Sequence, residues 1–257
     1  MELDEAYANG KYIAGGDAYP DKWSAAAKAF RDSTNATLDV SYGPSDRQRF
    51  DLFQPDGKPR GVVIFVHGGY WLHFDKSSWS HLAAGPLAHG WAVAMPSYDL
   101  CPDVRISDIT RQIAAAVQAI AATVAGPIRL TGHSAGGHLV ARMLDPAIAG
   151  DWMHRVDKTV PISPLGDLAP LLRTSMNADL GLDEAEAQAE SPIHQAIPQS
   201  SVTVVVGADE RPAFIEQANG LAATWSEACH IEPERHHFDI VELLAEPDSS
   251  LTRILLG

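Results

Sequence analysis

The chain has 257 residues, of which 46% are hydrophobic and 20% charged, and its formal net charge is −14 at pH 7. This composition is typical of one large soluble α/β domain, and the acidity argues against nucleic acid or an anionic membrane surface as a partner. No apolar run approaches the roughly 20 residues of a membrane span, and the acidic start at residues 1–5 does not resemble a signal peptide. We therefore expect a cytoplasmic protein in which Cys101 and Cys229 are buried thiols. A homodimer is compatible with the sequence, which does not decide the oligomeric state.

The N-terminal third begins with a polar segment and continues into strands. Residues 1–35 are alanine-rich with interspersed aromatic residues, which predicts a helical arm. Residues 36–42 and 47–53 resemble strands on either side of the Gly-Pro-Ser-Asp turn at 43–46, so a hairpin is expected.

The remainder alternates strands and helices. We predict strands at 62–66, 91–95, 128–131, 158–162, 202–206 and 229–232, and helices at 78–89, 106–124, 135–144, 213–225 and 240–245, the last being the final helix. This alternation predicts an α/β fold with a mostly parallel central sheet and helices on both faces, in a single domain over residues 1–257.

One proline-flanked segment, residues 164–198, interrupts the alternation. It contains two short helical patches, at 168–173 and 183–189. Insertions at the carboxyl edge of a sheet often cover a site. We therefore expect a small cap formed by this insertion and the N-terminal arm.

A glycine-rich turn follows the strand at 128–131 and reads Gly-His-Ser-Ala-Gly at 132–136. The spacing Gly-x-Ser-x-Gly between a strand and a helix is that of a nucleophile elbow, in which the serine takes a strained backbone conformation. Ser134 is therefore the candidate nucleophile. The alternative is that Ser134 is the N-cap of an ordinary helix.

A second glycine-rich turn, His-Gly-Gly-Tyr-Trp at 67–71, follows the strand at 62–66. The N–H groups of Gly69 and Tyr70, together with that of Ala135, could converge on one oxyanion. His67 is expected to brace this loop by hydrogen bonding. The alternative is a plain turn between a strand and a helix.

A nucleophilic serine needs a base and an acid that orients it, and in this type of fold they follow in the order Ser, acid, His. Asp209 and Glu210 both follow the strand at 202–206 and qualify as the acid. His236 and His237 both follow the last strand and qualify as the base. The residues alone leave both choices open.

The sequence resembles the kynurenine formamidases, a branch of the α/β-hydrolases close to the hormone-sensitive-lipase esterases. Their signature His-Gly-Gly-x-Trp is matched at residues 67–71. Further matches are Ser97-Tyr98-Asp99-Leu100-Cys101-Pro102, Gly132-His133-Ser134-Ala135-Gly136-Gly137-His138-Leu139 and His237-Phe238-Asp239-Ile240-Val241. The resemblance covers roughly residues 40–245 and implies metal-independent hydrolysis of N-formylkynurenine to formate and kynurenine.

The resemblance also implies a choice at the open positions. The family histidine directly precedes a phenylalanine, which indicates His237, and the family acid falls at Glu210, where many relatives have aspartate. Trp71, Tyr98 and the cap could line an aromatic-binding pocket, and the alternative for each is core packing. No cofactor is expected, and no metal, because the histidines lack ligand spacing.

The sequence thus predicts a serine hydrolase for a small-molecule formamide or ester, with arylformamidase activity as the first hypothesis. A short-chain carboxylesterase or thioesterase is the runner-up, because a triad does not specify its leaving group. A non-catalytic ligand-binding protein on the same scaffold is a third, remote hypothesis, since such proteins usually lack a triad member.

Overall fold

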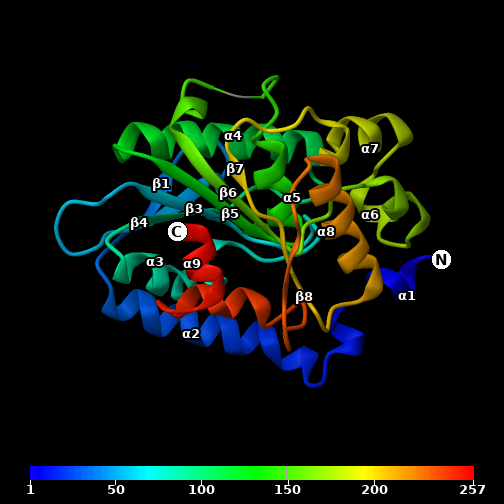
Figure 1. The fold of residues 1–257 in the computed structure, drawn as a ribbon, viewed down its shortest axis with the longest axis horizontal. Helices are drawn as coiled ribbons and strands as arrows, with labels where there is room; N and C mark the ends of the chain where they lie inside the picture. The colour runs from blue at the N-terminus through cyan, green and yellow to red at the C-terminus, as the bar shows by residue number, and fades with distance from the viewer. Residues whose placement is uncertain (149) are drawn as a thin grey trace.

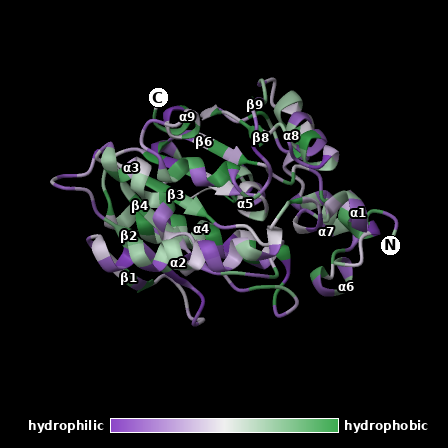
Figure 2. Cartoon of the chain, turned by 90° about the horizontal axis from the view of Figure 1, so that it is seen from below, coloured by the Kyte–Doolittle hydropathy of each residue, from purple (hydrophilic) through white to green (hydrophobic). Residues whose placement is uncertain are grey.

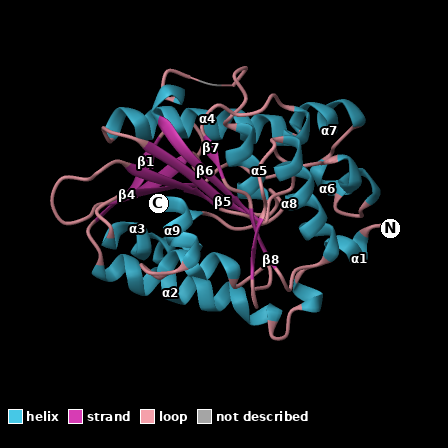
Figure 3. Cartoon of the chain, viewed as in Figure 1, coloured by secondary structure: helices cyan, strands magenta, loops and turns pink. Residues whose placement is uncertain are grey.

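The computed structural model describes residues 1–148 and 150–257. Within them, nine strands form one sheet of order β1-β2-β4-β3-β5-β6-β8-β9, with β7 paired to β6 off this path. The strands are β1 (Ala36–Ser41), β2 (Arg49–Phe53), β3 (Val62–Val66), β4 (Ala92–Pro96), β5 (Ile128–His133), β6 (Val156–Ile162), β7 (Ser201–Val202), β8 (Val205–Gly207) and β9 (His230–Glu232). β2 is antiparallel to both neighbours and the other pairings are parallel. Figure 3 shows the strands gathered between the helices. The predicted mostly parallel sheet is therefore confirmed.

Helices cover both faces of the sheet (Figure 1). The α-helices are α1 (Asp4–Tyr7), α2 (Tyr19–Ser33), α3 (Ala84–Ala88), α4 (Ile106–Thr123), α5 (Ala135–Arg142), α6 (Asn177–Leu180), α7 (Glu184–Glu190), α8 (Pro212–Thr224) and α9 (Ser250–Leu256). Short 3-10 helices lie at Gly10–Tyr12, Gly16–Ala18, Lys76–Ser78, Ser80–Ala83, Met153–Arg155, Ala169–Arg173, Pro192–His194 and Ile240–Ala245. α4, α5 and α8 pack on one face, whereas α2, α3 and α9 pack on the other.

The central strand β3 shows why two layers of helices are needed. All five of its residues are buried, and successive side chains point to opposite faces. Ile64 belongs to the cluster that packs under α4 and α5, and Phe65 belongs to the cluster under α2 and α9. Figure 2 shows the hydrophobic residues concentrated on these inner strands. A strand that is apolar on both sides is stable only when both faces are covered.

Three predicted elements differ from the structure. The helix expected at 78–89 is α-helical only at α3 (Ala84–Ala88), and the 3-10 helices Lys76–Ser78 and Ser80–Ala83 precede it. The segment 202–206 is not one strand but contributes to two, β7 and β8, because Thr203 and Val204 between them are not in regular strand pairing. There Thr203 N–H donates to the Thr159 carbonyl of β6, and the Val204 carbonyl accepts from His230 N–H of β9. The segment Ile240–Ala245 is a 3-10 helix and not the final helix, since α9 follows it.

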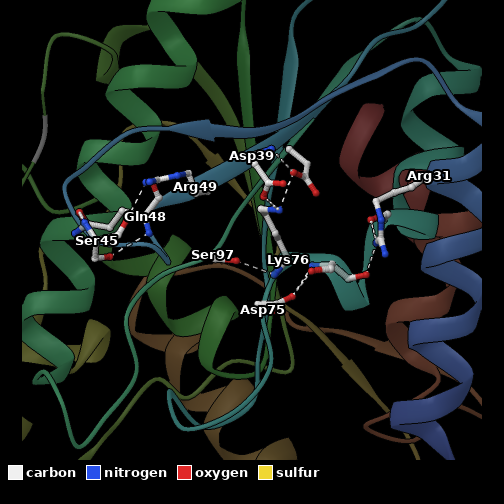
Figure 4. A network of polar contacts seen from close by, with 11 residues as sticks. Arg31, Asp39, Ser45, Gln48, Arg49, Asp75, Lys76 and Ser97 are labelled. Atoms are coloured by element: carbon white, nitrogen blue, oxygen red, sulfur yellow. Dashed lines mark hydrogen bonds and ion pairs between the residues drawn. The ribbon is translucent and has the colours of Figure 1, made fainter.

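A buried ion pair fixes the predicted hairpin against the centre of the molecule (Figure 4). The register of β1 against β2 shifts around Asp39, whose φ is 57°. Lys76 Nζ lies 2.7 Å from Asp39 Oδ1 and 2.8 Å from Asp51 Oδ1, and the Lys76 and Asp51 side chains are only 9% and 2% exposed. Lys76 N–H also donates to Ser97 Oγ at 2.9 Å. These contacts anchor the segment that follows the glycine-rich turn at 67–71.

The start of the N-terminal arm contacts the insertion at 164–198, where Leu3 N–H donates to the Arg173 carbonyl at 3.3 Å and Ser175 N–H donates to Asp4 Oδ1 at 2.6 Å. The arm runs along the carboxyl end of the sheet, where the Tyr7 carbonyl accepts from Tyr70 Oη at 2.6 Å. The insertion also packs on α4, α5 and α8, through Thr110 Oγ1 to Glu190 at 2.7 Å, His138 Nε2 to the Glu190 carbonyl at 2.7 Å, and Gly166 N–H to Gln217 Oε1 at 2.9 Å. Across the described residues, no helix combines the length and apolar character needed to cross a bilayer.

Candidate active site

Ser134 occupies a sharp turn between β5 and α5. Its φ of 56° and ψ of −117° lie outside the usual regions for an L-residue, a conformation that costs on the order of 1–3 kcal/mol. A Cβ on Gly132 would lie 2.3 Å from the Gly136 carbonyl oxygen, and a Cβ on Gly136 would lie 1.9 Å from the Val66 carbonyl oxygen. Both glycines are therefore required by close backbone packing, and Ser134 is more strained than an ordinary helix N-cap.

A buried acid–histidine pair lies beside this turn. His237 Nδ1 is 2.6 Å from Glu210 Oε2, and the two side chains are 4% and 0% exposed. Glu210 Oε1 accepts two further hydrogen bonds, from Gly207 N–H at 2.9 Å and from Ser163 Oγ. With every nearby group donating to the carboxylate, His237 carries its proton on Nδ1, which leaves a lone pair on Nε2.

The two alternative residues are placed elsewhere. The Asp209 side chain is exposed and makes no hydrogen bond within the described residues. His236 faces the N-terminal arm, with Nε2 at 3.2 Å from Tyr19 Oη and Nδ1 accepting from Phe238 N–H at 3.1 Å. Of the four candidates, Glu210 and His237 are the two that the structure brings together.

The glycine-rich turn at 67–71 lies directly against Ser134. A Cβ on Gly68 would come within 3.1 Å of Ser134 Cβ. Gly69, Tyr70 and Trp71 have positive φ values of 107°, 54° and 58°. Within the described part of the chain, the N–H groups of Gly69 and Tyr70 have no protein acceptor, nor has that of Ala135 at the start of α5. These three donors are free to bind an anion.

His67 and Tyr98 brace this turn from behind. His67 Nδ1 donates to the Gly68 carbonyl at 2.8 Å, and Tyr98 Oη donates to the His67 carbonyl at 2.8 Å. The His67 and Tyr98 rings stack with centroids 4.3 Å apart. Burial lowers the pKa of His67 to about 4, so the imidazole is neutral at pH 7. His67 therefore braces the turn by hydrogen bonding, as the sequence predicted.

A cavity of about 300 Å³ opens onto Ser134 and His237. It is lined by Tyr7, Ala8, Asn9, Gly10, Pro20, Trp23, Gly69, Tyr70, His73, Phe74, Trp79, His133, Ser134, Met176, His237 and Phe238. The N-terminal arm and α2 supply one wall, from Tyr7 to Trp23, and the insertion contributes Met176. None of the described residues that line it is Asp, Glu, Lys or Arg. The cavity therefore suits a small, largely apolar and aromatic ligand.

Trp71 and Tyr98, which we expected at the substrate pocket, do not line this cavity. Both side chains are completely buried. Trp71 packs edge-on against His138 of α5 with ring centroids 5.0 Å apart. The positive φ at Trp71 turns its side chain into the core under the glycine-rich turn. Both residues therefore pack in the core, which was the alternative to a place at the substrate pocket.

Sequence reasoning missed several residues that surround the site. His133 lines the cavity and packs on His237 with ring centroids 4.6 Å apart, and burial together with the neighbouring His237 lowers the pKa of His133 well below its usual value. Ser163 follows β6 and has a φ of 48°, and its Oγ donates a hydrogen bond to the Glu210 carboxylate. Trp23 reaches the cavity from α2. Of these, only the aromatic residues of the arm gave a signal in the sequence.

No metal-binding cluster accompanies this arrangement. Over residues 1–148 and 150–257, no group of three or more His, Cys, Asp or Glu side chains lies close enough to hold a metal ion. Cys101 is buried and Cys229 partly buried, both are free thiols, and burial raises the pKa of Cys229 to about 11. Neither cysteine lines the cavity.

Comparison with known proteins agrees with this geometry. A family model described as the alpha/beta hydrolase fold matches residues 63–226, which is more than half of the chain. This chain belongs to the α/β-hydrolase family. Within that family, a kynurenine formamidase from Salmo salar is 31% identical, with coverage of 85% of this chain and 80% of the relative. A kynurenine formamidase from Danio rerio is 28% identical, with coverage of 88% and 83%. The resemblance read from residues 67–71 is confirmed.

Two solved structures have the same architecture. A crystal structure from Silicibacter sp., provisionally described as a thioesterase, superposes with a TM-score of 0.98 over 100% of both chains at 56% identity. An esterase from Pyrobaculum calidifontis superposes with a TM-score of 0.74 over 93% of this chain and 90% of its own, at 16% identity. The second likeness concerns the fold alone, whereas the first extends to sequence over the whole chain.

Proposed function

We propose that this α/β-hydrolase is a serine hydrolase with Ser134 as nucleophile, His237 as base and Glu210 as the acid that orients His237. One observation carries the proposal. The strained Ser134, the His237 ring of the buried 2.6 Å acid–histidine pair, and Gly69 and Tyr70 with their free N–H groups all line the same cavity. Strain of this kind persists where the surrounding structure holds it, and it gathers at reactive sites.

The proposed reaction follows from a His237 ring that carries its proton on Nδ1 and a lone pair on Nε2. Ser134 Oγ attacks the carbonyl carbon of the substrate and passes its proton to His237 Nε2, while Glu210 stabilises the imidazolium. The N–H groups of Gly69, Tyr70 and Ala135 bind the oxyanion, and each such donor is worth on the order of 3 kcal/mol in the transition state. The leaving nitrogen or oxygen takes the proton from His237 as its bond to carbon breaks. Water then repeats these steps on the acyl-serine and releases the acid.

The first candidate substrate class is aryl formamides such as N-formylkynurenine. The aromatic lining of the cavity, with Trp23, Phe74, Trp79 and Phe238, supports an aromatic leaving group. Relatives that cover most of the chain are kynurenine formamidases. Among the described residues, no Lys or Arg lines the cavity that could pair with the carboxylate of an amino acid. We therefore expect recognition of the aryl formamide itself, with the amino-acid end of N-formylkynurenine left in solvent.

A short-chain carboxylesterase or thioesterase is the second candidate. The observation that favours it is the 56% identity, over the whole chain, to the Silicibacter protein provisionally described as a thioesterase. The same serine, histidine and N–H groups would act on a thioester or an oxygen ester without change. A cavity of about 300 Å³, at the low end of ligand sites, supports short acyl groups over long ones.

The test is a substrate panel with Ser134→Ala as the blank. We would measure kcat/KM on N-formylkynurenine, formanilide, an acyl thioester, and the p-nitrophenyl acetate, butyrate and octanoate series. A preference for the two formamides, with formanilide within about tenfold of N-formylkynurenine because no charge contact is lost, supports the arylformamidase. Ester or thioester turnover with negligible deformylation supports the second candidate. Hydrolysis that survives Ser134→Ala would overturn the nucleophile assignment, and absence of all turnover would favour a binding protein.

A further inference from the structure

His73 is a polar residue of the cavity wall that is exposed and whose side chain has no partner. It lines the 300 Å³ cavity just after the glycine-rich turn at 67–71. The residue is exposed, and its imidazole makes no hydrogen bond or ion pair to any described residue. A histidine ring carries at least one N–H donor in either protonation state. A ligand in the cavity can therefore reach an unused hydrogen-bond donor at the rim.

The other polar side chains of the lining are already bonded or are enclosed. Tyr70 Oη donates to the Tyr7 carbonyl at 2.6 Å, and Tyr7 Oη accepts from a glutamine of α8 at 3.0 Å. Asn9 and His133 are 6% and 3% exposed, and Asn9 Oδ1 and His133 Nε2 are fully enclosed. The indole N–H groups of the two tryptophans in the wall are enclosed as well. Apart from the proposed nucleophile and base, His73 is therefore the described residue that offers a ligand a free polar side chain.

The backbone that carries the His73 ring is held in place. His73 N–H donates to the Gly69 carbonyl at 3.0 Å, and a Cβ on Gly69 would lie 2.5 Å from the His73 carbonyl oxygen. The next carbonyl, that of Phe74, accepts from Arg47 Nη2 at 2.5 Å. The imidazole is thus presented by a fixed segment beside Gly69, one of the proposed oxyanion donors, as a recognition group requires.

The position of Phe74 indicates which part of a substrate would reach His73. Phe74 also lines the cavity, and its ring centroid lies 6.4 Å from that of His73 at an interplanar angle of 74°. An aromatic leaving group that packs on the wall containing Phe74 would hold its ring substituents beside His73. No Asp or Glu among residues 1–148 and 150–257 lines the cavity, so a negatively charged substituent meets no like charge in this wall.

We propose that the His73 imidazole donates a hydrogen bond to a carboxylate carried by the aromatic leaving group. This contact makes His73 the residue that favours aryl formamides with an anionic side chain, such as N-formylkynurenine, over uncharged ones. The carboxylate stays at the solvent-exposed mouth of the cavity and gains one hydrogen bond there. An ammonium group would instead call for an acidic partner, which the described lining lacks. This inference rests on the arylformamidase function proposed above.

The experiment compares N-formylkynurenine with its decarboxylated analogue, which keeps the aryl formamide, the ketone and the amine. The readout is the ratio of the two kcat/KM values after subtraction of the Ser134→Ala rate. In His73→Phe, which keeps a flat ring and has no donor, we expect this ratio to fall about threefold to tenfold, as for loss of one exposed hydrogen bond to a charged group. The change should appear in KM and not in kcat, because the contact is the same in the ground state and in the transition state.

Two further variants separate this contact from a change of shape. His73→Gln keeps an N–H donor and should retain the ratio of the wild type within about twofold. His194→Phe is the matched control, since His194 is also exposed, its side chain makes no hydrogen bond to the described residues, and it does not line the cavity. It should leave both kcat/KM values within about twofold of the wild type.

Each outcome supports or overturns one level of the proposal. A lower ratio in His73→Phe that is absent from His73→Gln and His194→Phe supports the role of His73. An unchanged ratio in His73→Phe, or a fall of the same size in either of the other two variants, overturns that role and leaves the arylformamidase intact. A wild-type protein that hydrolyses esters or thioesters but neither formamide overturns the arylformamidase itself, and this pattern is seen before any His73 variant is made.

Discussion

Replacement of Glu210 by glutamine tests the arrangement of the site most directly. The carboxylate accepts from three donors, His237 Nδ1, Gly207 N–H and Ser163 Oγ, and its side chain is fully buried. Glutamine has nearly the same shape, but one of its two terminal groups is a donor. At least one of the three donors must then face another donor, or the His237 proton must move to Nε2. A proton on Nε2 removes the lone pair that would take the proton from Ser134.

The size of the effect can be worked from these contacts. Loss of the base through the wrong tautomer lowers kcat by about 10⁴-fold in serine hydrolases whose triad acid is made neutral. That factor corresponds to about 5 kcal/mol of transition-state stabilisation. The binding of substrate involves the cavity walls and not the carboxylate, so KM should change much less than kcat. Glu210→Asp should also be impaired, because the shorter side chain cannot keep the Nδ1 contact at 2.6 Å.

The assay is steady-state hydrolysis of the best substrate from the panel, with circular dichroism and thermal unfolding to show that each variant is folded. Asp209→Asn is the matched control, since Asp209 is the adjacent acid and its exposed side chain makes no hydrogen bond within the described residues. We expect Asp209→Asn to keep kcat within about twofold of the wild type. A large loss in Asp209→Asn with a small one in Glu210→Gln would refute the assignment of the acid.

Three further predictions concern stability, each measured by urea unfolding. Gly136→Ala places a methyl group on a carbonyl oxygen of β3 and should lower the free energy of unfolding by about 3 kcal/mol or prevent folding, and a neutral result would contradict the elbow geometry. Lys76→Met leaves Asp51 buried without a cation and should cost about 3–5 kcal/mol, whereas Lys28→Met on the surface should cost less than about 1 kcal/mol. Burial lowers the pKa of His67 to about 4, so between about pH 6.5 and pH 4 the unfolded chain binds more protons than the folded one. The contribution of His67 to the free energy of unfolding is therefore fully present above about pH 6.5 and is lost as the pH drops toward 4, a change of about 3 kcal/mol. His67→Asn should make this pH dependence shallower. A pH profile that is unchanged in His67→Asn would argue against a buried neutral imidazole.

Much of the fold could be read from the sequence because its signals are local. The apolar run at β3 and the long amphipathic pattern of α4 give strand and helix by periodicity alone. The elbow at Ser134 is also local, since the glycines that it needs lie two residues away on either side. The break between β7 and β8 could not be predicted from the sequence, because Val and Thr favour strands throughout residues 202–206. The break depends on hydrogen bonds that this segment makes to β6 and β9.

The sequence by itself determined the fold class and the family, and it supplied the candidate serine, acid and histidine. These depend on short motifs whose backbone demands are met within a few residues. Only the tertiary structure decided that Glu210 and not Asp209 contacts His237, that Trp71 lies in the core, and that Asn9 borders the cavity. Such choices depend on contacts between segments up to about 230 residues apart, and no local preference specifies which side of a turn will meet a distant neighbour.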